Sequence, residues 1–160
     1  MQTPEPLPPF SGETELLPPR PAPRAVPPAD WGERLAWVAG LVLAVSAFTD
    51  WYAGTQVDGL TLAVTGWHTG ALGKLVFFVG LATLILEALR EAGAELPATV
   101  PESLVLIALG ALGTIFVLIR LISIPDVYFA TASRGVGIYI SLVAALVLIV
   151  AGILRASEEL

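Results

Sequence analysis

Long apolar runs without a single charge alternate with short polar segments along this chain. The charge-free runs are Leu35–Thr49, Leu75–Leu86, Ser103–Ile119 and Gly135–Leu154. Each run reaches roughly 20 residues once flanking charged side chains are allowed to snorkel, which is enough to cross a ~30 Å hydrocarbon core. The pattern therefore predicts an all-α membrane protein, built as a four-transmembrane-helix bundle in up-down order.

Capping and aromatic residues locate the ends of these helices. Asp30 is suited to cap the first helix. Trp31 and Trp37 are expected at one membrane interface, and Trp51 and Tyr52 at the other, as an aromatic belt. The predicted transmembrane domain covers residues 31–156, with helices over about 32–51, 70–90, 101–122 and 135–155, and a short acidic tail follows at 157–160.

Residues 1–30 form a separate block that holds ten of the 13 prolines. Proline removes amide donors and fixes φ, so we predict a disordered, Pro-rich cytoplasmic tail rather than a helix or strand. PxxP spacings such as Pro18 to Pro21 leave two interpretations open. The tail is either a solvated tether or a recognition motif for an aromatic-lined groove.

A turn signal lies in the loop that follows the first predicted helix, over 53–69. Asp58 and Gly59 tolerate the positive φ values of a type I′ turn. The sequence therefore predicts a short β-hairpin in the first outer loop, with Gln56–Val57 and Leu60–Thr65 as its arms.

Composition supports the membrane assignment and excludes several functions. With 56% hydrophobic and 14% charged residues, a soluble protein of this size would expose large apolar patches. The chain has no cysteine and one histidine, His68, so neither a disulfide framework nor a zinc site is expected. A net charge of −6 without a basic face disfavours nucleic-acid binding. Phosphate-binding loops, HExxH and serine-elbow motifs do not occur, so we predict no catalysis and no cofactor.

The basic residues decide the predicted orientation. If both termini are cytoplasmic, five basic residues lie inside and three lie outside. The inner set is Arg20, Arg24, Arg34, Arg90 and Arg155, and the outer set is Lys74, Arg120 and Arg134. This distribution favours a multi-pass protein of the cell membrane with cytoplasmic N and C termini.

Small residues recur at four-residue spacing on three predicted helices, where they allow close backbone approach in lipid. They are Ala36, Gly40 and Ala44 in the first run, Gly110 and Thr114 in the third, and Gly137, Ser141 and Ala145 in the fourth. We expect these three helices to approach most closely within one bundle. The alternative is that one of these faces mediates homo-oligomerisation.

Few polar side chains fall inside the predicted spans. The hydroxyls are those of Ser46, Thr83, Thr114 and Ser141, and each can bond the carbonyl one turn back. Lys74 and Glu87 in the second span are expected to snorkel to its two ends. The sequence therefore predicts no ionisable group deep in the bundle.

One group of side chains is a candidate site, because the proposed topology brings its members to the outer interface. The group consists of Asp50, Trp51, Lys74, Arg120, Asp126 and Arg134. Arg120 follows a long charge-free run, so we expect it low in the interface, paired with Asp50 or Asp126. The cluster is either a structural ion pair with ordinary snorkelling or a site for a lipid head group or extracellular ligand.

Several short motifs resemble small uncharacterised four-span membrane proteins of high-GC Gram-positive bacteria. The motifs are Phe48-Thr49-Asp50-Trp51-Tyr52, Thr65-Gly66-Trp67, Arg120 followed by Pro125, and Arg134-Gly135-Val136-Gly137-Ile138-Tyr139. The resemblance spans residues 35–155 and implies a fold and a membrane without implying an activity. The topology is also similar to that of claudin-like tetraspan proteins, although the first outer loop here lacks their cysteine pair.

These observations predict a non-catalytic integral membrane protein. Its partners are the lipid bilayer and, as an accessory or scaffold protein, other membrane proteins. The alternative is a subunit of a small oligomeric channel or transporter.

Overall fold

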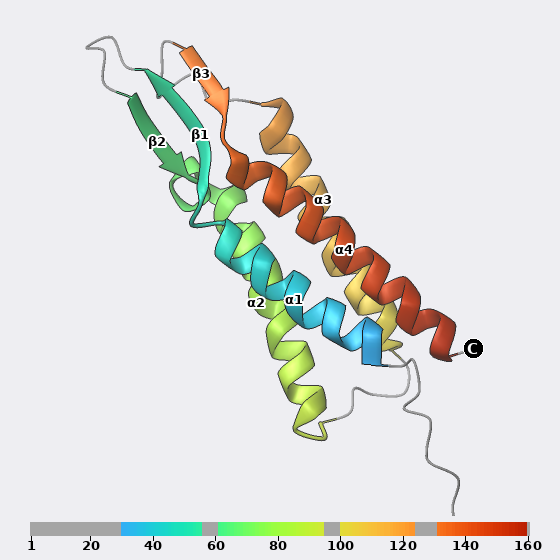
Figure 1. Cartoon of the computed structure of the whole chain (residues 1–160). Coiled ribbons are helices and arrows are strands. Elements are labelled where there is room, and N and C mark those ends of the chain that lie inside the picture. Colours follow the sequence, from blue (N-terminus) through green and yellow to red (C-terminus); the bar gives the residue numbers. More distant parts are fainter. Residues whose placement is uncertain (1–29, 56–60, 95–99, 124–130, 160) are drawn as a thin grey trace, which may run out of the picture.

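The computed structural model describes residues 30–55, 61–94, 100–123 and 131–159 (Figure 1). The predicted Pro-rich tail, the Asp58–Gly59 turn and Asp126 lie outside the described residues.

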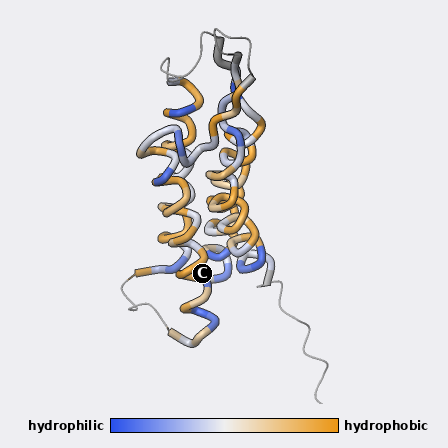
Figure 2. The backbone as a smooth tube through the Cα atoms, turned by 90° about the vertical axis from the view of Figure 1, so that its left-hand side faces the viewer, coloured by the Kyte–Doolittle hydropathy of each residue, from blue (hydrophilic) through white to orange (hydrophobic). Residues whose placement is uncertain are grey.

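Four helices run alternately up and down along a common long axis (Figure 1). They are α1 (Asp30–Ser46), α2 (Ala71–Glu91), α3 (Glu102–Ile122) and α4 (Val136–Glu159). Apolar residues follow the helices, and polar residues gather near their ends (Figure 2). By length and composition α2, α3 and α4 can each cross a membrane. The first helix, α1, has 17 residues and is shorter than these three.

The first helix ends at Ser46, before the predicted limit of residue 51. The Thr49 hydroxyl and the Trp51 indole N–H both donate to the Ser46 carbonyl oxygen, at 2.6 and 2.8 Å. The Thr49 amide also donates to this oxygen, at 3.1 Å, and the three donors replace the helical hydrogen bond that ends here. The chain then continues as a strand from Asp50. At the other end of the chain α4 runs to Glu159, so residues 157–159 of the predicted acidic tail continue this helix.

A three-stranded antiparallel sheet stands at one end of the bundle, which we call the sheet end (Figure 1). The order is β2-β1-β3, with β1 (Asp50–Thr55) in the centre, β2 (Thr61–Thr65) from the same loop, and β3 (Thr131–Arg134) from the loop before α4. The β1–β2 pair confirms a strand pair in the first outer loop, with Thr61–Thr65 inside the predicted second arm. The predicted first arm, Gln56–Val57, lies outside the described residues, and the observed partner strand is Asp50–Thr55. The third strand was not predicted. A short 3-10 helix, η1 (Gly66–Thr69), leads from β2 into α2.

The helices pack as a ring in which each contacts two neighbours, in the order α1, α2, α3, α4. The expectation that the first, third and fourth helices approach most closely is met for two pairs, because α3–α4 and α1–α4 are the most extensive helix contacts. It is wrong for α1 and α3, which lie across the ring from each other. The start of α1, the end of α2, the start of α3 and the end of α4 lie opposite the sheet, and we call this the terminal end (Figure 1).

Glycines set the tightest helix contacts. A Cβ added to Gly80 of α2 would lie 2.5 Å from the Ala44 backbone nitrogen. On α3, a Cβ added to Gly110 would lie 2.8 Å from the Ile149 nitrogen. Such distances allow no side chain, so backbones of α1 and α2, and of α3 and α4, meet directly. The predicted small-residue faces of α1, α3 and α4 are thus used inside the bundle, together with a glycine on the otherwise bulky α2.

Many small residues lie inside the bundle, and many large apolar residues lie on its outer surface. Ala36, Ala145 and Ala151 are fully buried, whereas Val143 and Leu104 are more than half exposed. This distribution suits a lipid surrounding, because water would be in contact with a continuous apolar surface.

Candidate functional site

At the sheet end, Trp51 and Tyr52 hold the central strand against the helices. Trp51 is fully buried, and its ring lies against Gly66, where an added Cβ would be 2.5 Å from the indole Cε2. Tyr52 is also buried. The prediction that both residues form an interfacial belt is therefore wrong. The chain turns into β1 directly after α1, and this turn directs both side chains inward.

The last carbonyls of α3 receive donors from the sheet. The Tyr52 hydroxyl donates to the Arg120 carbonyl oxygen at 2.5 Å, and Arg134 Nε donates to the Leu121 carbonyl oxygen at 2.8 Å. A cation here also complements the negative end of the helix dipole. Burial raises the pKa of the Tyr52 phenol, and the positive charges of Arg120 and Arg134 partly oppose that rise.

The guanidinium of Arg120 bonds to backbone rather than to a carboxylate. Its Nη2 donates to the Thr69 carbonyl oxygen at the end of η1. Its Nε is buried and has no hydrogen-bond partner among the described residues. The expected ion pair with Asp50 does not form, and Asp126, the other expected partner, lies outside the described residues.

Lys74 lies on an aromatic cluster rather than among the other cations. Its Nζ is 5.6 Å from the centroid of the Trp67 ring, within the range of a cation–π contact. Trp67 stacks on Phe48, and both rings contact Phe77. Of the five predicted site residues that the structure describes, Arg120 and Arg134 lie at the end of α3, Trp51 is buried, and Lys74 lies in the first turn of α2. Asp50 lines a cavity with Arg134.

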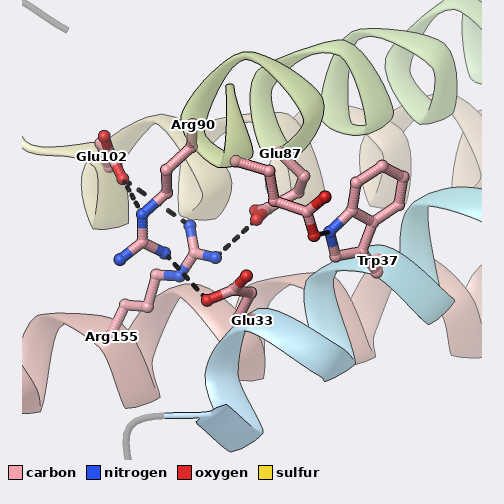
Figure 3. A network of polar contacts seen from close by, with 7 residues as sticks. Glu33, Trp37, Glu87, Arg90, Glu102 and Arg155 are labelled. Carbon is pink, nitrogen blue, oxygen red and sulfur yellow. Dashed lines mark hydrogen bonds and ion pairs between the residues drawn. The ribbon is translucent and has the colours of Figure 1, made fainter. Parts of the chain in front are cut away.

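The terminal end contains a buried ion pair that the sequence analysis missed (Figure 3). Arg155 Nη2 of α4 lies 2.6 Å from Glu87 Oε2 of α2. The two side chains are 4% and 1% exposed. The expectation that Glu87 snorkels is therefore wrong, because a partner inside the bundle replaces water as the source of its hydrogen bond.

This pair belongs to a charged network that includes residues from all four helices (Figure 3). Arg90 reaches Glu102 at 3.2 Å and Glu33 at 3.7 Å, and Arg155 approaches Glu102 at 3.9 Å. Three carboxylates and two guanidinium groups therefore alternate across the bundle. Opposite charges on different helices favour one relative arrangement of those helices.

Some polar atoms in the network have no hydrogen-bond partner within the part of the chain that the structure describes. They are Glu87 Oε1, Arg155 Nε and Arg155 Nη1, all buried. The sequence contains one weak signal of the pair: each residue lies about one turn inside the end of its helix.

Between the two ends the bundle interior is apolar apart from hydroxyl groups. Ser46, Thr83, Thr114 and Ser141 each donate to a carbonyl within the preceding turn, at 2.7 to 3.0 Å, as predicted. Ser141 also lies 2.8 Å from the Ser46 hydroxyl. No group of three or more potential metal ligands occurs in the described part of the chain.

Comparisons of the chain with protein-family models, with curated proteins and with solved structures give no match.

Proposed function

We propose that this protein is a non-catalytic, four-span protein of the cell membrane, an accessory or scaffold protein that binds other membrane proteins through its sheet. The observation that carries the proposal is the attachment of the sheet to the helices. Trp51 bonds to α1, Tyr52 and Arg134 bond to α3, and the Gly135 amide donates to the Trp51 carbonyl oxygen at 2.7 Å. A sheet held this firmly is pre-organised for binding.

The exposed edge of the sheet supports this role. The strand β2 pairs only with β1 among the described strands, so its other edge is open. Its sequence, Thr-Leu-Ala-Val-Thr, has no charge and no proline, although natural proteins usually protect open edges with such residues. An extended segment of a partner can add to an edge of this kind through backbone hydrogen bonds.

The fourth span in this proposal is α1. Its 17 residues extend about 26 Å at 1.5 Å per residue, close to the ~30 Å hydrocarbon core. It packs along α2 and α4, each long and apolar enough to cross a membrane. With four spans, both termini lie on one side, and the distribution of basic residues favours the cytoplasm.

Site-specific photocrosslinking in native membranes tests the sheet as the binding surface. A photoreactive amino acid replaces Leu62 on β2, and the control replaces Leu104 on α3; these side chains are 46% and 58% exposed. We expect a discrete membrane-protein adduct from position 62 alone, retained when residues 1–30 are deleted. An adduct that disappears with the tail would assign binding to the tail instead.

A second candidate function, a subunit of an oligomeric channel or transporter, is favoured by the buried Glu87–Arg155 pair. Ionisable groups inside membrane helices commonly mark ion or proton pathways. The apolar interior around Leu43 and Val117 requires several copies to line a path. The corresponding test is flux into vesicles that contain the reconstituted protein. Flux that is lost with Glu87→Gln and retained with Glu91→Gln would support this function over scaffolding.

A further inference from the structure

An apolar groove runs along the outer surface between α1 and α4. Its volume is about 370 Å³, and its walls include Val38 and Val42 of α1 and Val143 and Val147 of α4. The groove lies in the middle of α1 and in the first half of α4, at a level where membrane helices meet hydrocarbon. An acyl chain is the molecule that this surrounding supplies.

A second cavity continues the groove towards the sheet end. Its volume is about 480 Å³, and Ile140 lines both spaces. Asp50 and Arg134 line this second cavity, and both are exposed. They do not pair with each other, and neither forms an ion pair with another described residue. The cavity therefore has a positive and a negative charge in its walls, each open to an outside partner.

The combined length of the groove and the second cavity matches the thickness of one membrane leaflet. From Val136 to Val147 α4 advances about 17 Å at 1.5 Å per residue, and Arg134 lies two extended residues, up to about 6 Å, before the helix. Half of a ~30 Å core plus one head-group layer of about 5–7 Å gives about 20–22 Å. A lipid with its head group beside Arg134 would have its chain beside Val143 and Val147.

We propose that the α1–α4 groove binds a zwitterionic phospholipid. The phosphate contacts Arg134, the ammonium group contacts Asp50, and one acyl chain occupies the apolar part. Arg134 uses Nε for the Leu121 carbonyl oxygen, so its two terminal nitrogens remain for the phosphate. The Asp50 carboxylate disfavours a purely anionic head group, so both charges together select a zwitterion. This inference is independent of the proposed scaffold function.

A photoactivatable lipid tests the site. The probe is phosphatidylethanolamine with a diazirine in one acyl chain, at low mole fraction in phosphatidylglycerol vesicles that contain the full chain. We expect labelling to concentrate on Val42 and Val143, and Val143→Trp to lower it roughly tenfold. Val150→Trp is the matched control, because Val150 is 49% exposed on α4 and does not line the groove.

Substitutions of Asp50 and Arg134 test which lipid head group the site binds. Asp50→Asn should lower labelling by the phosphatidylethanolamine probe and leave labelling by a phosphatidylglycerol probe unchanged or higher. Arg134→Gln should lower labelling by both probes. Uniform labelling of all exposed helix faces, unaffected by Val143→Trp, would overturn the proposal. Crosslinks from these positions to a protein helix in place of lipid would overturn it as well, because they would identify a different occupant.

Discussion

Glu87 and Arg155 are 68 residues apart in the sequence, yet Glu87 Oε2 and Arg155 Nη2 lie 2.6 Å apart inside the bundle. The pair joins the last turns of α2 and α4, and neither side chain is more than 4% exposed. A buried pair of this kind contributes little net stability, but loss of one member leaves an uncompensated buried charge.

Removing one member of the pair should therefore cost more stability than replacing both members. Arg155→Met should lower the free energy of unfolding by about 3–5 kcal/mol, because it leaves the Glu87 carboxylate buried without its partner. The double variant Glu87→Met/Arg155→Met should recover most of the loss, since two apolar side chains then fill the same volume. Unfolding by denaturant in detergent micelles measures both. A double variant as unstable as the single one would show that packing, not charge, causes the effect.

Arg90 provides a contrast within the same network. Its side chain is 42% exposed, and its pairs with Glu102 and Glu33 are 3.2 and 3.7 Å long. Water screens such contacts, so Arg90→Ala should change the unfolding free energy by less than about 1 kcal/mol. The small difference should shrink further in high salt. A loss comparable to that of Arg155→Met would mean that Arg90 supports the buried pair directly.

Two glycine substitutions should have opposite effects. A Cβ on Gly80 would approach the Ala44 nitrogen to 2.5 Å, so Gly80→Ala should force α1 from α2 and destabilise the bundle by roughly 1–3 kcal/mol. A Cβ on Gly113 would meet its neighbours at 3.5 Å, an ordinary contact. Gly113→Ala should therefore be neutral or stabilise α3 by up to about 1 kcal/mol. Thermal unfolding of the two variants, measured side by side, tests both expectations.

The pH dependence of stability should show the contribution of Tyr52. Its pKa is raised in the folded protein above the ordinary value of 10.0, so folding favours the protonated phenol. The Tyr52 contribution is fully present below pH 10 and is lost as the pH rises from there through the folded pKa. The difference in unfolding free energy between the protein and Tyr52→Phe should be constant at pH 7–9 and decrease above that range. A difference that grows with pH would mean that folding lowers this pKa.

Local signals in the sequence predicted most of the helical architecture. Charge-free runs predicted the four helices, and the turn signal in the first outer loop predicted a strand pair there, which the structure shows as β1 and β2. Hydropathy and turn chemistry act over a few residues, so a window along the chain can detect them. The boundary at Ser46 was missed because the donors that end α1 come from side chains beyond the helix.

The candidate site was predicted less well, because it depends on contacts distant in sequence. The segment Thr131-Ala132-Ser133-Arg134 has no apolar alternation, and only the open edge of β1 makes it a strand. In the sequence Glu87 is only a charge near the end of a helix, because its partner, Arg155, lies far away on α4. For Arg120 the expected carboxylate partner was Asp50 or Asp126, yet the structure gives it the backbone of η1.

The order of the strands has a consequence for biosynthesis. Because β1 lies between β2 and β3, the central strand is made early and its second neighbour only after α3. A nascent chain that stops before Thr131 therefore keeps one edge of β1 open. In the proposed four-span arrangement, the sheet can be completed only when the α1–α2 and α3–α4 connections have reached the same side of the membrane, so the finished sheet would mark a chain whose insertion is complete.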